Sequence, residues 1–233
     1  MPPRPASPRR EILRQAVSIA LAVTPFGVAF GVVSVEAGLA LWEASAFSVF
    51  VFAGSAQFAA VDVLGEGGAA TAAIATGIGL NLRSLALGVT MSPALTGPLW
   101  KRALWSQLMI DESMAVGTAQ RDRRWQRYGY LAAGIGVFVT WNLSTLAGAA
   151  VFSSARDAIT TWGIDATIPA AFLALLWPRL GFPDQRRTAL AGAVIGLALT
   201  PVAPPGIAII AAGLGVLAGW RAPAGSGRSR SSS

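Results

Sequence analysis

The sequence GIGLNLRSLALG, residues 77–88, places a charged side chain, Arg83, inside one of the most apolar stretches of the chain. An arginine at the centre of a bilayer costs about 2.5 to 3.5 kcal/mol on insertion scales, so it normally faces a protein interior, a wet cavity or a counter-charge. Two interpretations follow from this cost. Either Arg83 belongs to a site for an anion or a carboxylate, or it forms an ion pair with a carboxylate on a neighbouring helix and only fixes the packing.

The composition around this stretch is that of a membrane protein. Hydrophobic residues make up 54% of the 233 residues and charged residues only 12%, whereas about 25% of the residues in soluble domains are charged. The charged residues gather between apolar runs of about 17 to 25 residues, each long enough to cross about 30 Å of hydrocarbon as a helix. We therefore expect an all-α integral membrane protein.

The apolar runs predict about eight transmembrane helices, or seven if the last two form a hairpin that crosses only part of the membrane. Their approximate ranges are 15–34, 42–64, 68–97, 103–119, 128–152, 164–178, 188–201 and 206–220. A basic cytoplasmic tail, residues 1–14, precedes this transporter domain of residues 15–220, and a Ser-, Gly- and Arg-rich tail, residues 221–233, follows it. The composition of the second tail predicts disorder.

The distribution of basic residues predicts the orientation of these spans. With the N-terminus in the cytoplasm, 14 Arg and Lys residues fall inside and three fall outside, namely Lys101, Arg102 and Arg156. Cytoplasmic loops carry an excess of basic residues, so this count favours an N-in and C-in topology. The same explanation accounts for the net charge of +7, and we expect no nucleic-acid partner.

Helix-breaking residues mark two of the predicted spans. Pro25, with Gly27 and Gly31 at GxxxG spacing, predicts a kinked first helix that packs closely against another helix. The third run, residues 68–97, is longer than one straight span requires and is interrupted by glycines around Asn81 and Arg83. Such an interruption is typical of a discontinuous helix, whose free N–H groups can hold a carboxylate, although a packing kink gives the same pattern.

Other polar side chains are predicted to lie at membrane depth. Ser55 and Gln57 belong to FAGSAQF, residues 52–58, and each needs a hydrogen-bond partner, either in a ligand site or between helices. Asp111 and Glu112 lie in the middle of the fourth run and Asp165 near the start of the sixth. Neighbouring helix positions point about 100° apart, so one of the two adjacent acids can face a cavity while the other pairs.

The residues that are missing restrict the chemistry. The chain has no cysteine and no histidine, which excludes disulfides and thiol catalysis and removes the commonest metal ligand and the usual proton carrier. The sequence also lacks a nucleophile–base pair, an HExxH motif, a phosphate-binding loop and a metal-binding cluster. We therefore expect no enzyme activity, no cofactor and no metal site, and any coupled proton must use a carboxylate.

The sequence also contains a weak internal repeat at an offset of about 110 residues. FGVVSVEAG at 30–38 aligns with TWNLSTLAG at 140–148, and FAGSAQF aligns with the run that opens WGIDATIPA at 162–170. Small apolar residues align easily by chance, so duplication and coincidence stay open. A true duplication would be typical of transporter folds, whose sites lie at the repeat interface.

Five ordered motifs resemble those of the AzlC family of branched-chain amino-acid permeases. They are PFGVAFG at 25–31, FAGSAQF at 52–58, NLR at 81–83, IDES at 110–113 and WGIDATIPAAFLALL at 162–176. The resemblance covers about residues 15–220. It implies the multi-pass large subunit of an exporter for leucine, isoleucine and valine in the cytoplasmic membrane of a bacterium, with a small partner subunit of the AzlD type. Family members often have a histidine after NLR, where this chain has Ser84, so no role of that histidine is carried over.

A branched-chain amino acid is a zwitterion with an apolar side chain, and the residues supply groups for each of its parts. Arg83 and nearby N–H groups would hold the carboxylate, and Asp111, Glu112 or Asp165 would hold the ammonium. Asn81, Gln57 and Ser55 would orient the ligand. A desolvated carboxylate would carry any coupled proton, with Asp111 as the first choice and Glu112 as the second. The alternatives are another small amino acid or organic acid as substrate, or a non-transporting membrane assembly subunit.

Overall fold

The computed structural model describes residues 8–161, 173, 177–203 and 207–219. All regular structure within these residues is helical, which confirms the all-α prediction. The chain divides into two compact units, Met1–Pro169 and Ala170–Ser233. The candidate site lies within the first unit.

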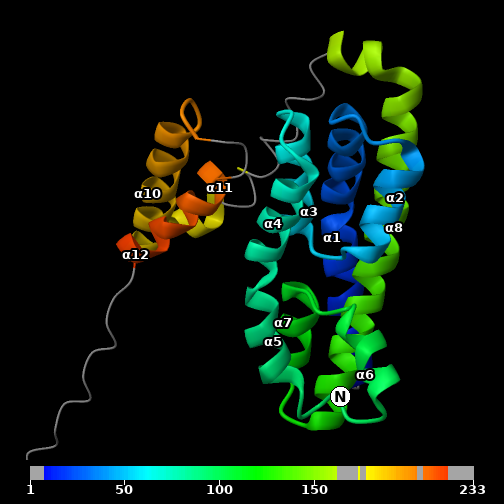
Figure 1. Cartoon of the computed structure of the whole chain (residues 1–233). Helices are drawn as coiled ribbons and strands as arrows, with labels where there is room; N and C mark the ends of the chain where they lie inside the picture. The colour runs from blue at the N-terminus through cyan, green and yellow to red at the C-terminus, as the bar shows by residue number, and fades with distance from the viewer. Residues whose placement is uncertain (1–7, 162–172, 174–176, 204–206, 220–233) are drawn as a thin grey trace, which may run out of the picture. The chain divides into compact units, whose positions relative to one another are not determined.

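The first unit is built on two long helices, α1 (Pro8–Glu36) and α8 (Arg123–Thr161), which run side by side in the same direction (Figure 1). Their contact depends on small residues: a Cβ atom added at Gly27 would overlap Ser144, and one added at Gly31 would overlap the carbonyl oxygen of Thr145. Helices can approach this closely only where side chains are absent. The predicted close packing at the GxxxG pair is therefore confirmed.

The segment predicted as the second span is instead a helical hairpin. Helix α2 (Leu41–Phe50) ends at three non-helical residues, 51–53, and α3 (Gly54–Gly65) returns toward the end from which α2 began (Figure 1). A Cβ atom at Gly65 would lie 3.4 Å from the Cβ atom of Ala37, just beyond the end of α1. With about 1.5 Å of rise per residue, each arm is about 15 to 18 Å long, roughly half the hydrocarbon core.

The third predicted run forms α4 (Ala70–Asn81) and α5 (Arg83–Met91) with only a slight interruption. Leu82, between them, keeps helical dihedrals of φ −55° and ψ −28°, so the two segments continue one another. The expected break with several free N–H groups does not occur here. Such groups are found instead at the starts of α3 and α7.

The fourth predicted span is a second hairpin, made of α6 (Leu99–Ser106) and α7 (Asp111–Thr118). It rises from the opposite end of the bundle and meets the first hairpin tip to tip (Figure 1). The side chain of Gln107 donates from its Nε2 atom to the carbonyl oxygens of Val49 (2.9 Å) and Phe50 (3.2 Å), which end α2. The two tips are therefore joined by hydrogen bonds.

This second hairpin changes the sidedness of two basic residues. The guanidinium carbon of Arg127 lies 4.0 Å from the ring centre of Trp105 in α6, so α6 lies beside the start of α8. Lys101 and Arg102 in α6 therefore share an end of the bundle with the basic residues 121–127. The eight-span topology had placed them at the opposite end.

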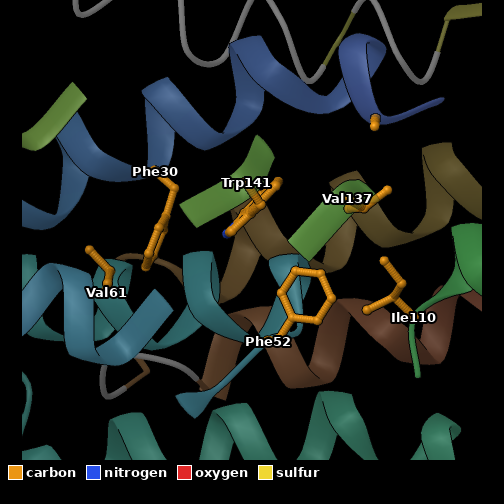
Figure 2. Close-up of a cluster of buried hydrophobic side chains, with 7 residues drawn as sticks. Phe30, Phe52, Val61, Ile110, Val137 and Trp141 are labelled. Atoms are coloured by element: carbon orange, nitrogen blue, oxygen red, sulfur yellow. The ribbon is translucent and has the colours of Figure 1, made fainter. Parts of the chain in front are cut away.

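An aromatic core surrounds the point where the tips meet. It combines residues of α1 and α8 with one residue from the tip of each hairpin and with Val61 of α3, and its members include Phe30, Phe52, Val61, Ile110, Val137 and Trp141 (Figure 2). Phe30 stacks on Trp141 with ring centres 6.2 Å apart, and Phe52 packs edge-on against Phe138 at 5.0 Å. Burial of these large rings in one cluster fixes both tips against the long helices.

Three helices in the described part of the chain are long and apolar enough to cross a membrane: Pro8–Glu36, Ala70–Met91 and Arg123–Ser154. They correspond to the first, third and fifth predicted spans. The two hairpins lie between them in sequence. This combination of three long apolar helices and two half-length hairpins is the scaffold of the candidate site.

The second unit is a hairpin within its described residues. Its elements are η2 (Trp177–Gly181), α10 (Pro183–Leu199), α11 (Ile207–Ala212), η3 (Gly213–Gly215) and α12 (Val216–Gly219). Gly215 packs against Gly192 and Gly219 against Thr188, so the later helices run back along α10. The last two predicted runs therefore pair as antiparallel helices, and whether they cross the membrane fully or only in part stays a prediction. Asp165, residues 1–7, the C-terminal tail and most of the sixth run lie outside the described residues, so the proposed repeat stays a prediction. Residues 8–14 of the predicted basic tail are helical and form the start of α1.

Candidate functional site

A cavity of about 210 Å³ lies where the two hairpin tips meet the middle of the α4–α5 helix. The tip of each hairpin, the α4–α5 junction and the facing surfaces of α1 and α8 all contribute to its wall. The lining residues are Val23, Phe52, Ala53, Gly54, Ser55, Asn81, Arg83, Ser84, Leu87, Met109, Ile110, Asp111, Glu112, Val137 and Trp141. Pockets for drug-sized ligands measure about 300 to 1,000 Å³, so this cavity suits a smaller molecule.

Arg83 connects the two hairpins across this cavity. Its Nη1 atom lies 2.9 Å from Oδ2 of Asp111, and its Nη2 atom donates to Oγ of Ser55 at 3.0 Å. Asp111 is the first residue of α7 and Ser55 the second residue of α3. The side chains of Arg83 and Asp111 are 49% and 55% exposed, so the ion pair faces an accessible space.

Five of the seven residues predicted for the site line this one cavity, namely Ser55, Asn81, Arg83, Asp111 and Glu112. Asn81 is fixed by its neighbour, because its Oδ1 atom accepts a hydrogen bond of 2.7 Å from the hydroxyl of Ser84. The residues come from three different segments, and only the reversal of the chain at each hairpin brings them together. Their individual roles stay predictions.

Gln57 lies outside the cavity. Its side chain is fully buried, and its Nε2 atom donates to the carbonyl oxygens of Phe47 and Ser48 at 3.4 Å each. These bonds join α3 to the end of α2, so Gln57 stabilises the first hairpin. This placement favours the expectation of a structural hydrogen bond over that of a ligand contact. Asp165 lies outside the described residues.

The starts of α3 and α7 lie in the wall of the cavity and differ in the charges around them. The first N–H groups of a helix have no partner within it and carry partial positive charge, which favours an anion. The first turn of α7 contains Asp111 and Glu112, but the first turn of α3 contains no acidic residue. The positive end of α3, next to Arg83, is thus the place in the cavity best suited to a carboxylate.

Several residues of the site were not predicted from the sequence. Gly54 begins α3 under the indole of Trp141, and a Cβ atom there would lie 3.2 Å from a ring carbon. Trp141 is buried, and its Nε1 atom has no hydrogen-bond partner in the described structure. Gln107 joins the two tips, as described above. A signal for Trp141 existed, since a tryptophan in mid-span departs from the usual placement of this residue near span ends.

The segment of the chain that forms the cavity is similar to known proteins. The model of a family described as "AzlC protein" matches residues 18–154, a segment that contains every residue lining the cavity. The chain is 26% identical over 141 residues to a protein named "Inner membrane protein YgaZ" of Escherichia coli (strain K12), and the alignment covers 58% of each chain. The chain thus spans less than two thirds of that relative's length. No solved structure matches the chain.

Proposed function

Because the chain belongs to the AzlC family, we propose that it is a secondary transporter that exports leucine, isoleucine and valine across the cytoplasmic membrane of a bacterium. The observation that carries the proposal is the cavity at the meeting point of the two hairpin tips, with Arg83, Asp111 and Glu112 in its wall. Charged groups of both signs at membrane depth match the two ends of a zwitterion.

Each part of the amino acid has a complementary surface in the cavity. Arg83 and the first N–H groups of α3 would hold the carboxylate, and Glu112 would hold the ammonium group. The aliphatic side chain would contact Phe52, Val137 and Met109, which line the same cavity. Asn81 would orient the ligand, because it lines the same cavity as Arg83.

The ion pair of Arg83 with Asp111 suggests how binding is coupled to movement. A substrate carboxylate would compete with Asp111 for the guanidinium group, since both are carboxylates that bind it in the same way. Asp111 would then lose its partner and become the site that takes up a proton. Glu112 remains the second choice for this proton-carrying role.

The two hairpins are the natural gates of such a transporter. They enter from opposite ends of the bundle (Figure 1), and the tip of each lines the cavity. With the N-terminus in the cytoplasm, α6 and α7 would close the cytoplasmic side, and α2 and α3 the outer side. Release of Arg83 from one hairpin tip while the other stays in place would open the site to one side at a time, as alternating access requires.

The N-in orientation also agrees with the hairpin arrangement. Lys101 and Arg102 join the residues 121–127 at the end where α1 and α8 begin, which increases the proposed cytoplasmic excess of basic residues. The C-in prediction and the small AzlD-type partner subunit belong to the same proposal. The exposed apolar face of α4 and α5, which includes Ile78, Leu85 and Val89, would contact lipid or that subunit.

Counterflow of labelled leucine into liposomes tests the proposal. We expect saturable exchange by this chain, reconstituted with its small partner subunit, that isoleucine and valine compete with and that the Arg83→Gln variant lacks. Correct folding of the variant is checked by its thermal unfolding. Exchange of a different amino acid or organic acid would correct the substrate class, and no exchange of any such solute would favour an assembly subunit.

A further inference from the structure

A second pocket, separate from the central cavity, lies at the end of the bundle where α1 and α8 begin. It has a volume of about 590 Å³, and four arginines line it: Arg9 from α1 and Arg123, Arg124 and Arg127 from α8. Tyr128 and Thr96 add hydroxyl groups to the wall, and no acidic residue lines it. This set of residues is called the basic pocket below.

The arginines of the basic pocket have no carboxylate partner within the described part of the chain. Aromatic and hydroxyl groups contact three of them instead: Arg127 stacks over Trp105, Arg124 lies 5.6 Å from the ring centre of Trp125, and Arg9 donates to the hydroxyl of Tyr128 at 3.3 Å. The nearest acid in sequence, Asp122, accepts the backbone N–H of Arg124 at 2.8 Å and so caps α8. The guanidinium groups therefore keep N–H donors for an external anion.

An apolar groove of about 630 Å³ continues from the basic pocket between the two long helices. Leu13, Val17 and Leu21 of α1 form one wall, and Ile135 and Val139 of α8 form the other. Tyr128 and Leu131 line both the groove and the basic pocket, so the two spaces adjoin.

The dimensions of the groove match those of a lipid chain in one leaflet. It follows α8 from Tyr128 to Thr140, which at 1.5 Å per residue is about 18 Å. Half of the hydrocarbon core measures about 15 Å. Both helices are among those able to cross a membrane, so the basic pocket falls at the headgroup level when the groove lies in the hydrocarbon.

We propose that the basic pocket and the apolar groove together form a binding site for one anionic phospholipid. The phosphodiester lies among Arg9, Arg123, Arg124 and Arg127, and one acyl chain lies in the groove. Charge selects the lipid class, because a zwitterionic headgroup brings a cation into a pocket with four arginines and no acid. The site is independent of the central cavity, so it stands whether or not the chain transports amino acids.

Native mass spectrometry of the full chain in detergent, titrated with lipid, tests this site. We expect one dioleoyl phosphatidylglycerol to bind at least tenfold more tightly than dioleoyl phosphatidylcholine, which has the same chains. One basic residue near an anionic surface is worth about a fivefold change in binding, so Arg123→Gln with Arg124→Gln should weaken phosphatidylglycerol binding about 25-fold. The fold should survive, since removal of positive charge from a helix N-terminus does not oppose the helix dipole.

The control variant carries Lys101→Gln and Arg102→Gln, which remove the same charge at the same end of the bundle but lie outside both spaces. It should bind phosphatidylglycerol as the unaltered chain does. Equal binding of the two lipids, or equal loss in the two variants, would overturn the proposal. Displacement of the lipid by inorganic phosphate at millimolar concentration would also overturn it, because the pocket would then be a site for free phosphate and the groove would contribute nothing.

Discussion

Arg83 and Asp111 form an ion pair of 2.9 Å between the middle of a helix long and apolar enough to cross a membrane and the first residue of a half-length helix. The same guanidinium group donates to Ser55 in the opposing hairpin. One side chain thus holds the tips of two hairpins that enter from opposite ends of the bundle. The structure agrees with both interpretations of Arg83 drawn from the sequence, because Arg83 forms an ion pair and this pair faces a cavity.

The two hairpins predict a sidedness that differs from that of eight continuous spans. Since the chain has no cysteine, single cysteines at Lys101, Arg121 and Glu66 can be labelled from either side of the membrane. We expect Lys101→Cys and Arg121→Cys to react from the same side and Glu66→Cys from the other. Labelling of Glu66→Cys together with Arg121→Cys, and of Lys101→Cys from the opposite side, would favour continuous spans.

The contact between α1 and α8 predicts a strong sensitivity to side-chain volume. Gly31→Val should lower the free energy of unfolding by about 1 to 3 kcal/mol or more, because the added side-chain atoms would overlap the backbone of Thr145 and Ala149. The matched control is Gly79→Val, where a Cβ atom meets nothing within 4 Å. Thermal unfolding in detergent measures the difference. Equal melting temperatures for the two variants would contradict the packing described here.

Much of this scaffold could be predicted from the sequence. Apolar runs and scarce charges indicate membrane helices, and the spacing of Gly27 and Gly31 indicates a close helix contact, because both signals depend on local chemistry. The hairpins could not be predicted in the same way. A run such as 42–64 has the length and hydropathy of a full span whether the chain continues or reverses at residues 51–53, and hydropathy carries no information on direction.

The candidate site, like the scaffold, could be predicted from the sequence only in part. Arg83, Asp111 and Glu112 could be identified because a charge at membrane depth needs a reason. For Gln57 the sequence leaves a ligand contact and a contact between helices open, because a buried amide looks alike in sequence in both cases. The structure shows a hairpin contact with the backbone carbonyls of α2. Gln107 could not be identified from the sequence, because its partners, the carbonyl groups that end α2, become available only after the chain has reversed.

The two adjacent acids are expected to have separable roles. Asp111→Asn should retain leucine counterflow, because exchange moves no net proton, but should lose accumulation driven by a pH gradient. Glu112→Gln should weaken leucine binding about tenfold or more, since a hydrogen bond to a charged group is worth about 1.5 to 3 kcal/mol. Half-saturation constants and gradient-driven uptake in liposomes measure both effects. Unchanged gradient-driven uptake in Asp111→Asn would assign the proton to another group.

The most direct test of the account is leucine counterflow by the charge-swapped variant, Arg83→Asp with Asp111→Arg. The swap keeps an ion pair between α5 and α7 but moves the guanidinium group away from the start of α3. If Arg83 binds the substrate carboxylate, the variant folds and assembles with the melting temperature of the unaltered chain yet shows no leucine exchange. Recovery of exchange in the swapped variant, after its loss in each single variant, would show that the pair only holds the hairpins together and would contradict the account.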